Sequence, residues 1–318
     1  MRVFLASPWI PAEWVRAHGL ESEGIWFAEA FRRSTPPLSA GSCAFAENVV
    51  QFAESQADAA VVFPTACDQL RRGYDAAVFR SSARAFLFDV PATQTPAARR
   101  LYRAELERLG NFLRQLGGTT PSPERLGAEL DAAGQVRSAL RTIAPFAEAR
   151  SLARALARFC RDGSLAEPLP PTIPKGVPLA IVGGPLSQAD WPLFDVIAAA
   201  GGFVALNGTD TGERILCPTW ENRPDPLAVL VDGYFDHLVD VFRRPNTGLY
   251  AWLQERLSAR QVRGIVLWCF TGCDLWRAEW QTLREACHLP VLLLETDDAA
   301  GLAPRDVSRL QAFVETLQ

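Results

Sequence analysis

The chain has 318 residues, of which 48% are hydrophobic and 21% are charged. A chain of this length can bury a large core and can form two domains of roughly 150 residues each. The formal net charge of −4 comes from interspersed acids and bases, without the basic run that binds a phosphate backbone. No apolar run reaches the roughly 20 residues that span a bilayer, and the N-terminus lacks the apolar core of a secretory signal. We therefore expect a cytoplasmic protein that binds neither nucleic acid nor a membrane.

The first half of the chain has the pattern of alternating strands and helices. The segment 58–64 has the length and the β-branched residues of a strand that is buried on both faces. Between 96 and 116, apolar residues recur at helical spacing, with arginines and glutamates on the opposite face. We expect strands over 2–7, 58–64 and 83–91, and helices over 11–20, 47–55, 96–116 and 123–160.

A proline-rich segment separates this half from a second one. Residues 166–178 contain five prolines, which is typical of a linker or a domain crossing. Alternation then resumes, with strands expected over 179–184, 203–208, 263–269 and 289–297, and helices over 190–202, 247–261, 274–287 and 304–318. A polar, irregular stretch is expected up to about 230. The sequence thus predicts an α/β protein with two parallel-sheet domains, over 1–165 and 179–318, joined by the linker 166–178.

Several common catalytic and nucleotide-binding motifs are missing from the sequence. There is no GxxxxGK[ST] motif, and the glycines of 183–188 lack the spacing of a dinucleotide fingerprint, so neither ATP nor NAD is expected. A GxSxG elbow is also absent, and His18, His237 and His288 lack the spacing of a zinc protease. We expect these three histidines to lie at the surface or to pack.

The cysteines remain as candidates for chemistry. The chain has seven, without the spacing of a disulfide framework, which fits a reducing compartment. Cys67 follows a predicted strand, Cys269 ends another, and Cys43 directly precedes a helix, whose N-terminus stabilises a thiolate. Ligands of open parallel sheets bind beyond the carboxyl ends of the strands. Three such thiolates suit an iron–sulfur cubane with one open iron, although a free packing thiol would equally explain each position.

Nine stretches, in this order, resemble the 2-hydroxyacyl-CoA dehydratase family, whose iron–sulfur subunits include relatives in benzoyl-CoA reductase and in double-cubane cluster proteins. They are PAEWVRAHGL, GSCAF, VVFPTACDQLRRGYD, FLFDVP followed by LYRAELERLGNFL, LAIVGGPL, GGFVALNGTDTGER, LWCFTGCDLW, LPVLLLETD and SRLQAF. The resemblance covers most of the chain. It implies two flavodoxin-like (Rossmann-like) domains with a cluster in the interdomain cleft, bound by three cysteines.

Carried onto this sequence, the resemblance assigns Cys43 and Cys67 as the first two ligands of a [4Fe-4S] cluster. The third is Cys269 or Cys273. Cys269 ends the strand and stands at the better distance before LPVLLLE, whereas Cys273 is the one followed by an aspartate, and Cys269 is favoured. If both were metal ligands, a double-cubane cluster would follow, with Cys217 as a possible further ligand. The remaining two, Cys160 and Cys287, are assigned to packing.

The resemblance also implies a reaction and its partners. In this family a separate ATP-dependent iron–sulfur activator passes a low-potential electron to the cluster, which acts on an acyl-CoA thioester. The expected enzyme is a dehydratase-type lyase or a benzoyl-CoA reductase-like oxidoreductase, paired with a homologous second subunit or forming a homodimer. The alternatives are a double-cubane-type reductase of small molecules and a non-catalytic scaffold subunit that lost its cluster. Glu13 and Arg309 also match family positions, and for them a helix cap and a structural salt bridge are favoured over catalysis.

Overall fold

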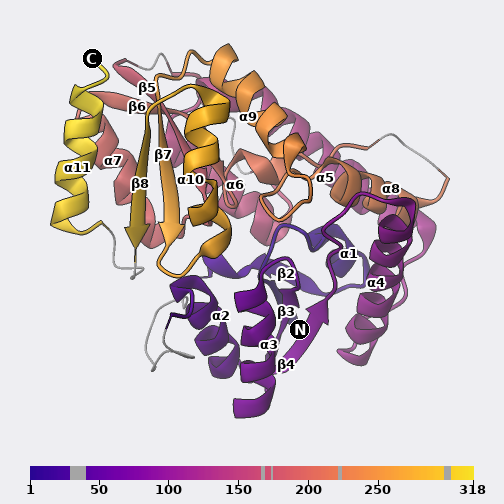
Figure 1. Ribbon diagram of the computed structural model, residues 1–318. Coiled ribbons are helices and arrows are strands. Elements are labelled where there is room, and N and C mark those ends of the chain that lie inside the picture. The colour runs from indigo at the N-terminus through magenta and orange to yellow at the C-terminus, as the bar shows by residue number, and fades with distance from the viewer. Residues whose placement is uncertain (29–40, 166–168, 173–174, 221–223, 297–301) are drawn as a thin grey trace.

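The computed structural model describes residues 1–28, 41–165, 169–172, 175–220, 224–296 and 302–318. In this part of the chain the strands form two four-stranded sheets, and every strand pair is parallel. Both sheets have the same order, in which the first strand lies between the second and the third (Figure 1). The predicted α/β class with two flavodoxin-like parallel sheets is confirmed.

The first sheet has the order β2-β1-β3-β4. Its strands are β1 (Arg2–Leu5), β2 (Glu21–Gly24), β3 (Ala59–Pro64) and β4 (Arg84–Phe88). Its helices are α1 (Ala12–Ala17), α2 (Ala44–Ser55), α3 (Asp68–Arg80) and α4 (Pro96–Gln115). Side chains alternate along β1, so Val3 packs with α1 and α4 whereas Phe4 packs with α2. Helices therefore cover both faces, as the buried β3 segment predicts.

The second sheet repeats this arrangement as β6-β5-β7-β8. Its strands are β5 (Val177–Gly183), β6 (Gly202–Thr209), β7 (Gly264–Phe270) and β8 (Val291–Thr296). Its helices are α7 (Pro192–Ala199), α9 (Thr247–Ala259), α10 (Asp274–Cys287) and α11 (Pro304–Glu315). Figure 1 shows α7 and α11 on one side of this sheet and α9 and α10 on the other.

Three segments differ from the sequence predictions. The helical region expected over 123–160 is two helices, α5 (Pro123–Ile143) and α6 (Ala149–Asp162), because Pro145 lies in the turn between them and lacks the N–H that a continuing helix needs. Strand β2 was not expected, since its sequence ESEG lacks the apolar residues typical of strands. Helix α8 (Pro226–Leu230) and a π-helical segment (Val231–Asp236) fall at the end of the stretch expected to be irregular.

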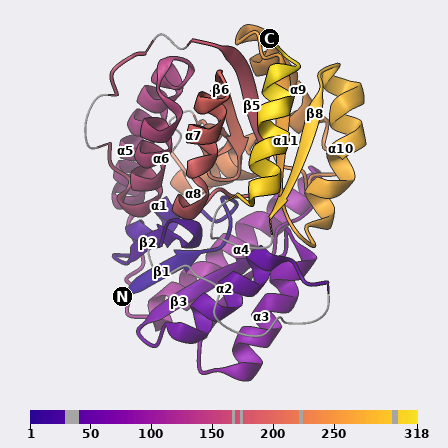
Figure 2. The same ribbon diagram turned by 90° about the vertical axis from the view of Figure 1, so that its left-hand side faces the viewer.

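The two sheets share one hydrophobic core. A single cluster of buried side chains includes Phe4 and Phe63 from the first sheet and Ile181 and Trp268 from the second. Helix α6 packs against β2 and also against β6, and Figure 2 shows it beside the second sheet. The domain limits 1–165 and 179–318 stay a prediction, and residues 166–168 and 173–174 of the expected linker lie outside the described part. No helix in the described ranges is long and apolar enough to cross a membrane.

A buried ion pair fixes α5 against α1. The guanidinium of Arg137 lies 2.7 Å from the carboxylate of Glu13, and both side chains are at least 96% buried. Tyr234 donates a hydrogen bond of 2.7 Å to the same carboxylate. Burial alone would raise the pKa of Glu13, but Arg137 and Arg16 hold this pKa below its usual value. Glu13 is therefore the anion of a structural salt bridge.

We expect the substitution Arg137→Met to lower the free energy of unfolding by about 3–5 kcal/mol, because it leaves the Glu13 carboxylate buried and unpaired. Urea denaturation of the purified protein measures this loss. As a control, Arg158→Gln removes an exposed pair with Asp162 and should cost at most about 1 kcal/mol. Equal losses for the two variants would contradict the stabilising role of the buried pair.

Candidate functional site

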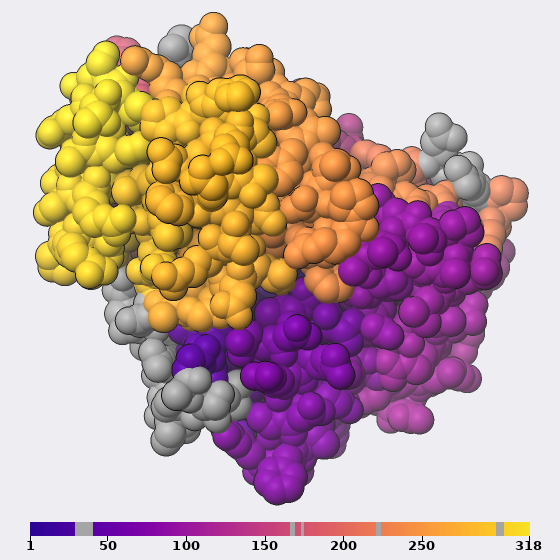
Figure 3. Space-filling view, viewed as in Figure 1, coloured from indigo at the N-terminus to yellow at the C-terminus, as the bar shows by residue number. Residues whose placement is uncertain are grey.

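A cavity lies where the carboxyl ends of both sheets face each other. Its empty space is about 650 Å³ and opens to solvent. Its walls come from the segments that follow β1, β3, β5 and β7, namely residues 6–9, 64–67, 184–185 and 270–276, among others. In each sheet these strands flank the point where the strand order reverses, which is where open parallel sheets bind ligands. In the space-filling view the two halves of the chain meet along a seam (Figure 3).

Three cysteines line this cavity, and each is the N-cap of a helix. Cys43 precedes α2, Cys67 precedes α3 and Cys273 precedes α10. None of the three sulfurs accepts a capping hydrogen bond, but backbone N–H groups of the first helical turns act to lower the pKa of each thiol. The free N–H groups and the dipole of a helix N-terminus both stabilise a thiolate. The cavity thus brings three sulfurs together at the N-termini of three helices.

Two of these thiols influence each other's ionisation. The interaction between Cys43 and Cys273 lowers the pKa of Cys43 and raises that of Cys273. Burial raises the pKa of Cys67 to about 11, with a further contribution from the nearby Cys43. In the metal-free protein at neutral pH, Cys43 therefore has the most thiolate character, whereas Cys67 and Cys273 are thiols.

Cys269 does not line this cavity. It lies within β7, where alternation places its side chain on the same face as Ile265 and Leu267, in the core beneath α9 and α10. It is fully buried, and burial raises its pKa to about 12. The neighbours Trp268 and Phe270 point to the opposite face. Cys273 thus lines the cavity together with Cys43 and Cys67, whereas Cys269 does not line it but lies close enough to Cys43 to interact with it electrostatically.

The other cysteines also lie away from this cavity. Cys217 packs at the edge of two core clusters, and Cys287 lies at the C-terminal end of α10. Cys160 lines a neighbouring cavity. Among the described residues, no group of three or more histidine, cysteine or acidic side chains is close enough to hold a single metal ion.

Two carboxylates also line the main cavity, and they share one arginine. Asp210, which follows β6, and Asp240 both line it. The guanidinium of Arg214 forms ion pairs with both carboxylates and is almost fully buried. No sequence motif singled out these residues as a site, although Asp210 and Arg214 lie in the stretch GGFVALNGTDTGER. Their role depends on Asp240, which comes from a distant segment that carries no recognisable motif.

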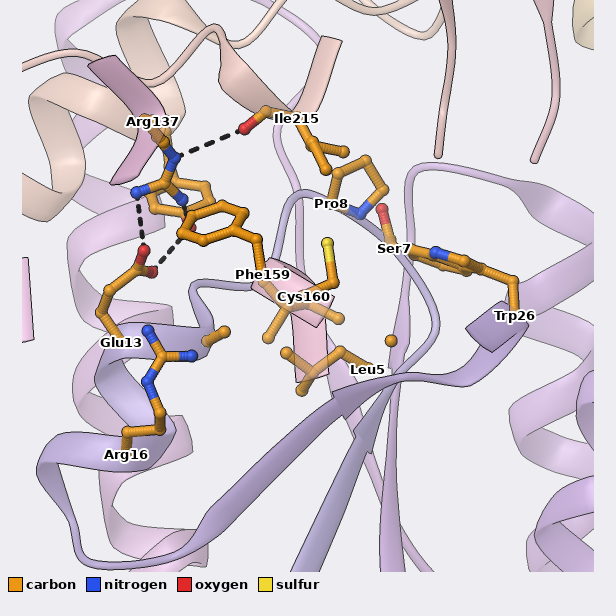
Figure 4. A pocket seen from close by; sticks show the side chains of 14 residues that line it. Leu5, Ser7, Pro8, Glu13, Arg16, Trp26, Arg137, Phe159, Cys160 and Ile215 are labelled. Carbon is orange, nitrogen blue, oxygen red and sulfur yellow. Dashed lines mark hydrogen bonds and ion pairs between the residues drawn. The ribbon is translucent and has the colours of Figure 1, made fainter. Parts of the chain in front are cut away.

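A second cavity, of about 480 Å³, adjoins the first and shares Ser7, Pro8 and Trp26 with it (Figure 4). Glu13 and Arg137 stand on one side of it, and Cys160 on α6 projects between them and Trp26. Arg16 also lines it and pairs with Glu129, so each of the three charged side chains has a partner, and the other walls are mainly apolar.

A comparison with known protein families identifies the family to which the chain belongs. It matches the family described as "2-hydroxyglutaryl-CoA dehydratase, D-component" over residues 3–317. The chain belongs to this family. The 2-hydroxyglutaryl-CoA dehydratase D-component family is one of lyase-type enzymes generally associated with iron–sulfur clusters, and its name implies further subunits. The resemblance noted in the nine sequence stretches is thereby confirmed.

A search of curated proteins found no match. Among solved structures, the chain is similar to a zinc-bound mutant variant of AdcAII from Streptococcus pneumoniae, with 8% identity, covering 100% of this chain and 99% of the other, at a TM-score of 0.22. A TM-score this low does not relate the two folds.

The interaction between Cys43 and Cys273 leads to a direct test of the cavity geometry. We expect a mild thiol oxidant such as diamide to join these two residues in the metal-free protein, because Cys43 is the thiolate that attacks. Mass spectrometry of unreduced peptides identifies the disulfide. The variants Cys43→Ser and Cys273→Ser should lose it, and Cys269→Ser should retain it. A disulfide between Cys43 and Cys269 would show that the structure places Cys273 wrongly.

Proposed function

We propose that the chain is the iron–sulfur subunit of a 2-hydroxyacyl-CoA dehydratase, with a [4Fe-4S] cluster held by Cys43, Cys67 and Cys273. The observation that carries this proposal is the meeting of three helix-capping cysteines in one cavity at the switch points of both sheets. Cys273 takes the place expected for Cys269, because Cys269 points into the core on the far face of β7. The family match supports the reaction class.

The donor set fits a cubane better than a single ion. Three thiolates leave one iron of a cubane without a cysteine ligand, and that iron is available to a substrate. A cubane is wider than one ion, so its ligands need not converge as closely as those of a zinc site. Cys217 does not line the cavity, which favours a single cubane over a double one.

The surrounding side chains would keep such a cluster dry and adjust its potential. Trp9, Trp26 and Trp276 line the cavity and are only 1%, 4% and 3% exposed. The indole N–H groups of Trp9 and Trp26 have no hydrogen-bond partner among the described residues. A buried N–H group without a partner lowers the stability of the fold. A hydrogen bond to cluster sulfide or to substrate oxygen would remove this loss. When bound, the cluster would supply one-electron chemistry at low potential.

The proposal assigns ATP hydrolysis to a partner. The sequence has no phosphate-binding loop, so an ATP-dependent activator would supply the electron from outside this chain. A homologous component, as the family name implies, or a second copy of this chain would complete the enzyme, and its substrate would be a 2-hydroxyacyl-CoA thioester.

We expect protein purified without oxygen, or reconstituted with iron and sulfide, to contain about four irons and four sulfides per chain, as a single cubane requires. Cys43→Ala, Cys67→Ala and Cys273→Ala should each lose most of this iron. Cys269→Ala is the matched control and should retain it, because its side chain packs in the core. Iron and acid-labile sulfide assays measure both. Loss of iron in Cys269→Ala with retention in Cys273→Ala would reverse the assignment, and no iron in any protein would end the proposal.

We also expect cluster loading to rise with pH. Cys67 and Cys273 have raised pKa values and must each lose a proton before they bind iron, so protons compete with the metal. Reconstitution at about pH 8.5 should therefore proceed further than at about pH 6.5, measured by visible absorbance and iron content. A cysteine-ligated ferredoxin loaded in parallel controls for the chemistry of iron and sulfide. Equal loading at both pH values would contradict the assignment of Cys67 and Cys273 as thiols.

A further inference from the structure

Asp210 shares the cavity with the three cysteines. It follows β6, at the same carboxyl edge of the second sheet as the segment that carries Cys273. Its side chain is 21% exposed, so it reaches the cavity while most of its surface is buried. Asp240 lines the same cavity from the segment after the π-helix. Two carboxylates thus stand at a site whose other walls are mainly apolar.

Arg214 holds both carboxylates in place. Its guanidinium pairs with Asp210 and lies 3.3 Å from the Asp240 carboxylate. The same group donates a hydrogen bond of 3.0 Å to the carbonyl of Gly183 at the end of β5. The guanidinium carbon of Arg214 lies 4.7 Å from the centre of the Trp276 ring. The arginine is 1% exposed and contacts three elements, so it cannot turn away to leave either carboxylate.

Asp210 and Asp240 share the guanidinium of Arg214, and Asp240 also interacts with the charge of Arg243. Because Arg214 divides its charge between two carboxylates, a proton bound to Asp210 can relieve the repulsion between them. Burial raises the pKa of Asp210 to about 7, and Arg214 opposes this rise while Asp240 adds to it. The other titratable groups that face the cavity are the thiols of Cys43, Cys67 and Cys273. Asp210 can therefore bind and release a proton near neutral pH at the cavity wall.

We propose that Asp210 is the acid–base residue that exchanges a proton with substrate in the cysteine cavity, and that Arg214 and Asp240 position it. This inference rests on the proposed function. In the elimination, the C2–O bond of the hydroxyacyl group breaks, and the proton of Asp210 joins the departing hydroxyl to form water. The hydrogen lost from C3 leaves as a proton and restores the carboxyl. The net change is the loss of one water, with no change in Asp210 and no net redox change.

The test uses the iron-loaded protein with its activating and partner subunits and 2-hydroxyglutaryl-CoA. We expect Asp210→Asn to lower kcat by about 10²–10⁴-fold with little change in KM, because it removes the exchangeable proton but preserves shape. Its iron content should equal that of the wild type. Asp131→Asn, an exposed carboxylate on α5, is the matched control and should leave kcat unchanged.

A second variant separates catalysis from structure. Asp240→Asn removes a like charge next to Asp210, so the pKa of Asp210 should fall. Because Asp210 donates its proton, the alkaline limb of the kcat profile should then move to lower pH. A merely structural role would lower activity without moving the profile. An unmoved profile, or an Asp210→Asn variant as active as the wild type, would overturn the inference.

The two proposals fail in different ways. Loaded wild-type protein that converts no 2-hydroxyacyl-CoA would overturn the proposed function and this inference with it. Active wild-type protein with an equally active Asp210→Asn variant would overturn only the role of Asp210. If Asp210→Asn does not fold, the pH profile of Asp240→Asn decides the question.

Discussion

The site depends on where parallel strands end. In the order 2-1-3-4, the connections after the first and third strands leave the sheet toward opposite faces, which opens a crevice between them. The chain builds this arrangement twice and packs the two crevices against each other around one shared core. The helices that begin there present free N–H groups to the same space. Residues far apart in sequence therefore meet at a point of positive potential, which suits thiolates and other anions.

Burial of charge is the second constraint on the cavity. The protein keeps Arg214 and Arg137 almost entirely out of water, and it does so only by giving each arginine carboxylates, carbonyl oxygens and aromatic rings as partners. Glu13 and Arg137 neutralise each other, so this pair has a structural role and no spare charge for catalysis. In the group around Arg214, two carboxylates share one guanidinium, and their mutual repulsion gives Asp210 the capacity to take up a proton. Similar residues thus serve structure in one cavity and suit chemistry in the next.

Much of the fold could be predicted from the sequence, because its signals are local. The buried segment of β3 and the amphipathic pattern of α4 are complete within a few turns or strand positions. Strand β2 was missed because its four residues, Glu21–Gly24, are strand only through pairing with β1. The family resemblance brought Cys43 and Cys67 into view as candidates. Strand alternation from Ile265 would have shown which way Cys269 points, but its position at the strand end outweighed that signal.

What the sequence could not provide is the set of contacts between distant segments. No local pattern indicates that Asp240 shares an arginine with Asp210, or that Tyr234 bonds to Glu13 across 221 positions. These contacts exist only after the two sheets have packed together. They also concern polar side chains, which follow no periodicity of the kind that locates a core.

The division of the three cysteines between the sheets has a mechanical consequence. Cys43 and Cys67 belong to the first sheet, whereas Cys273 belongs to the second. Any group bound by all three would link the two halves of the chain across the seam. Ligand binding by the three cysteines would then be coupled to the packing of the two halves against each other. A displacement of one half would change the distances between the sulfurs.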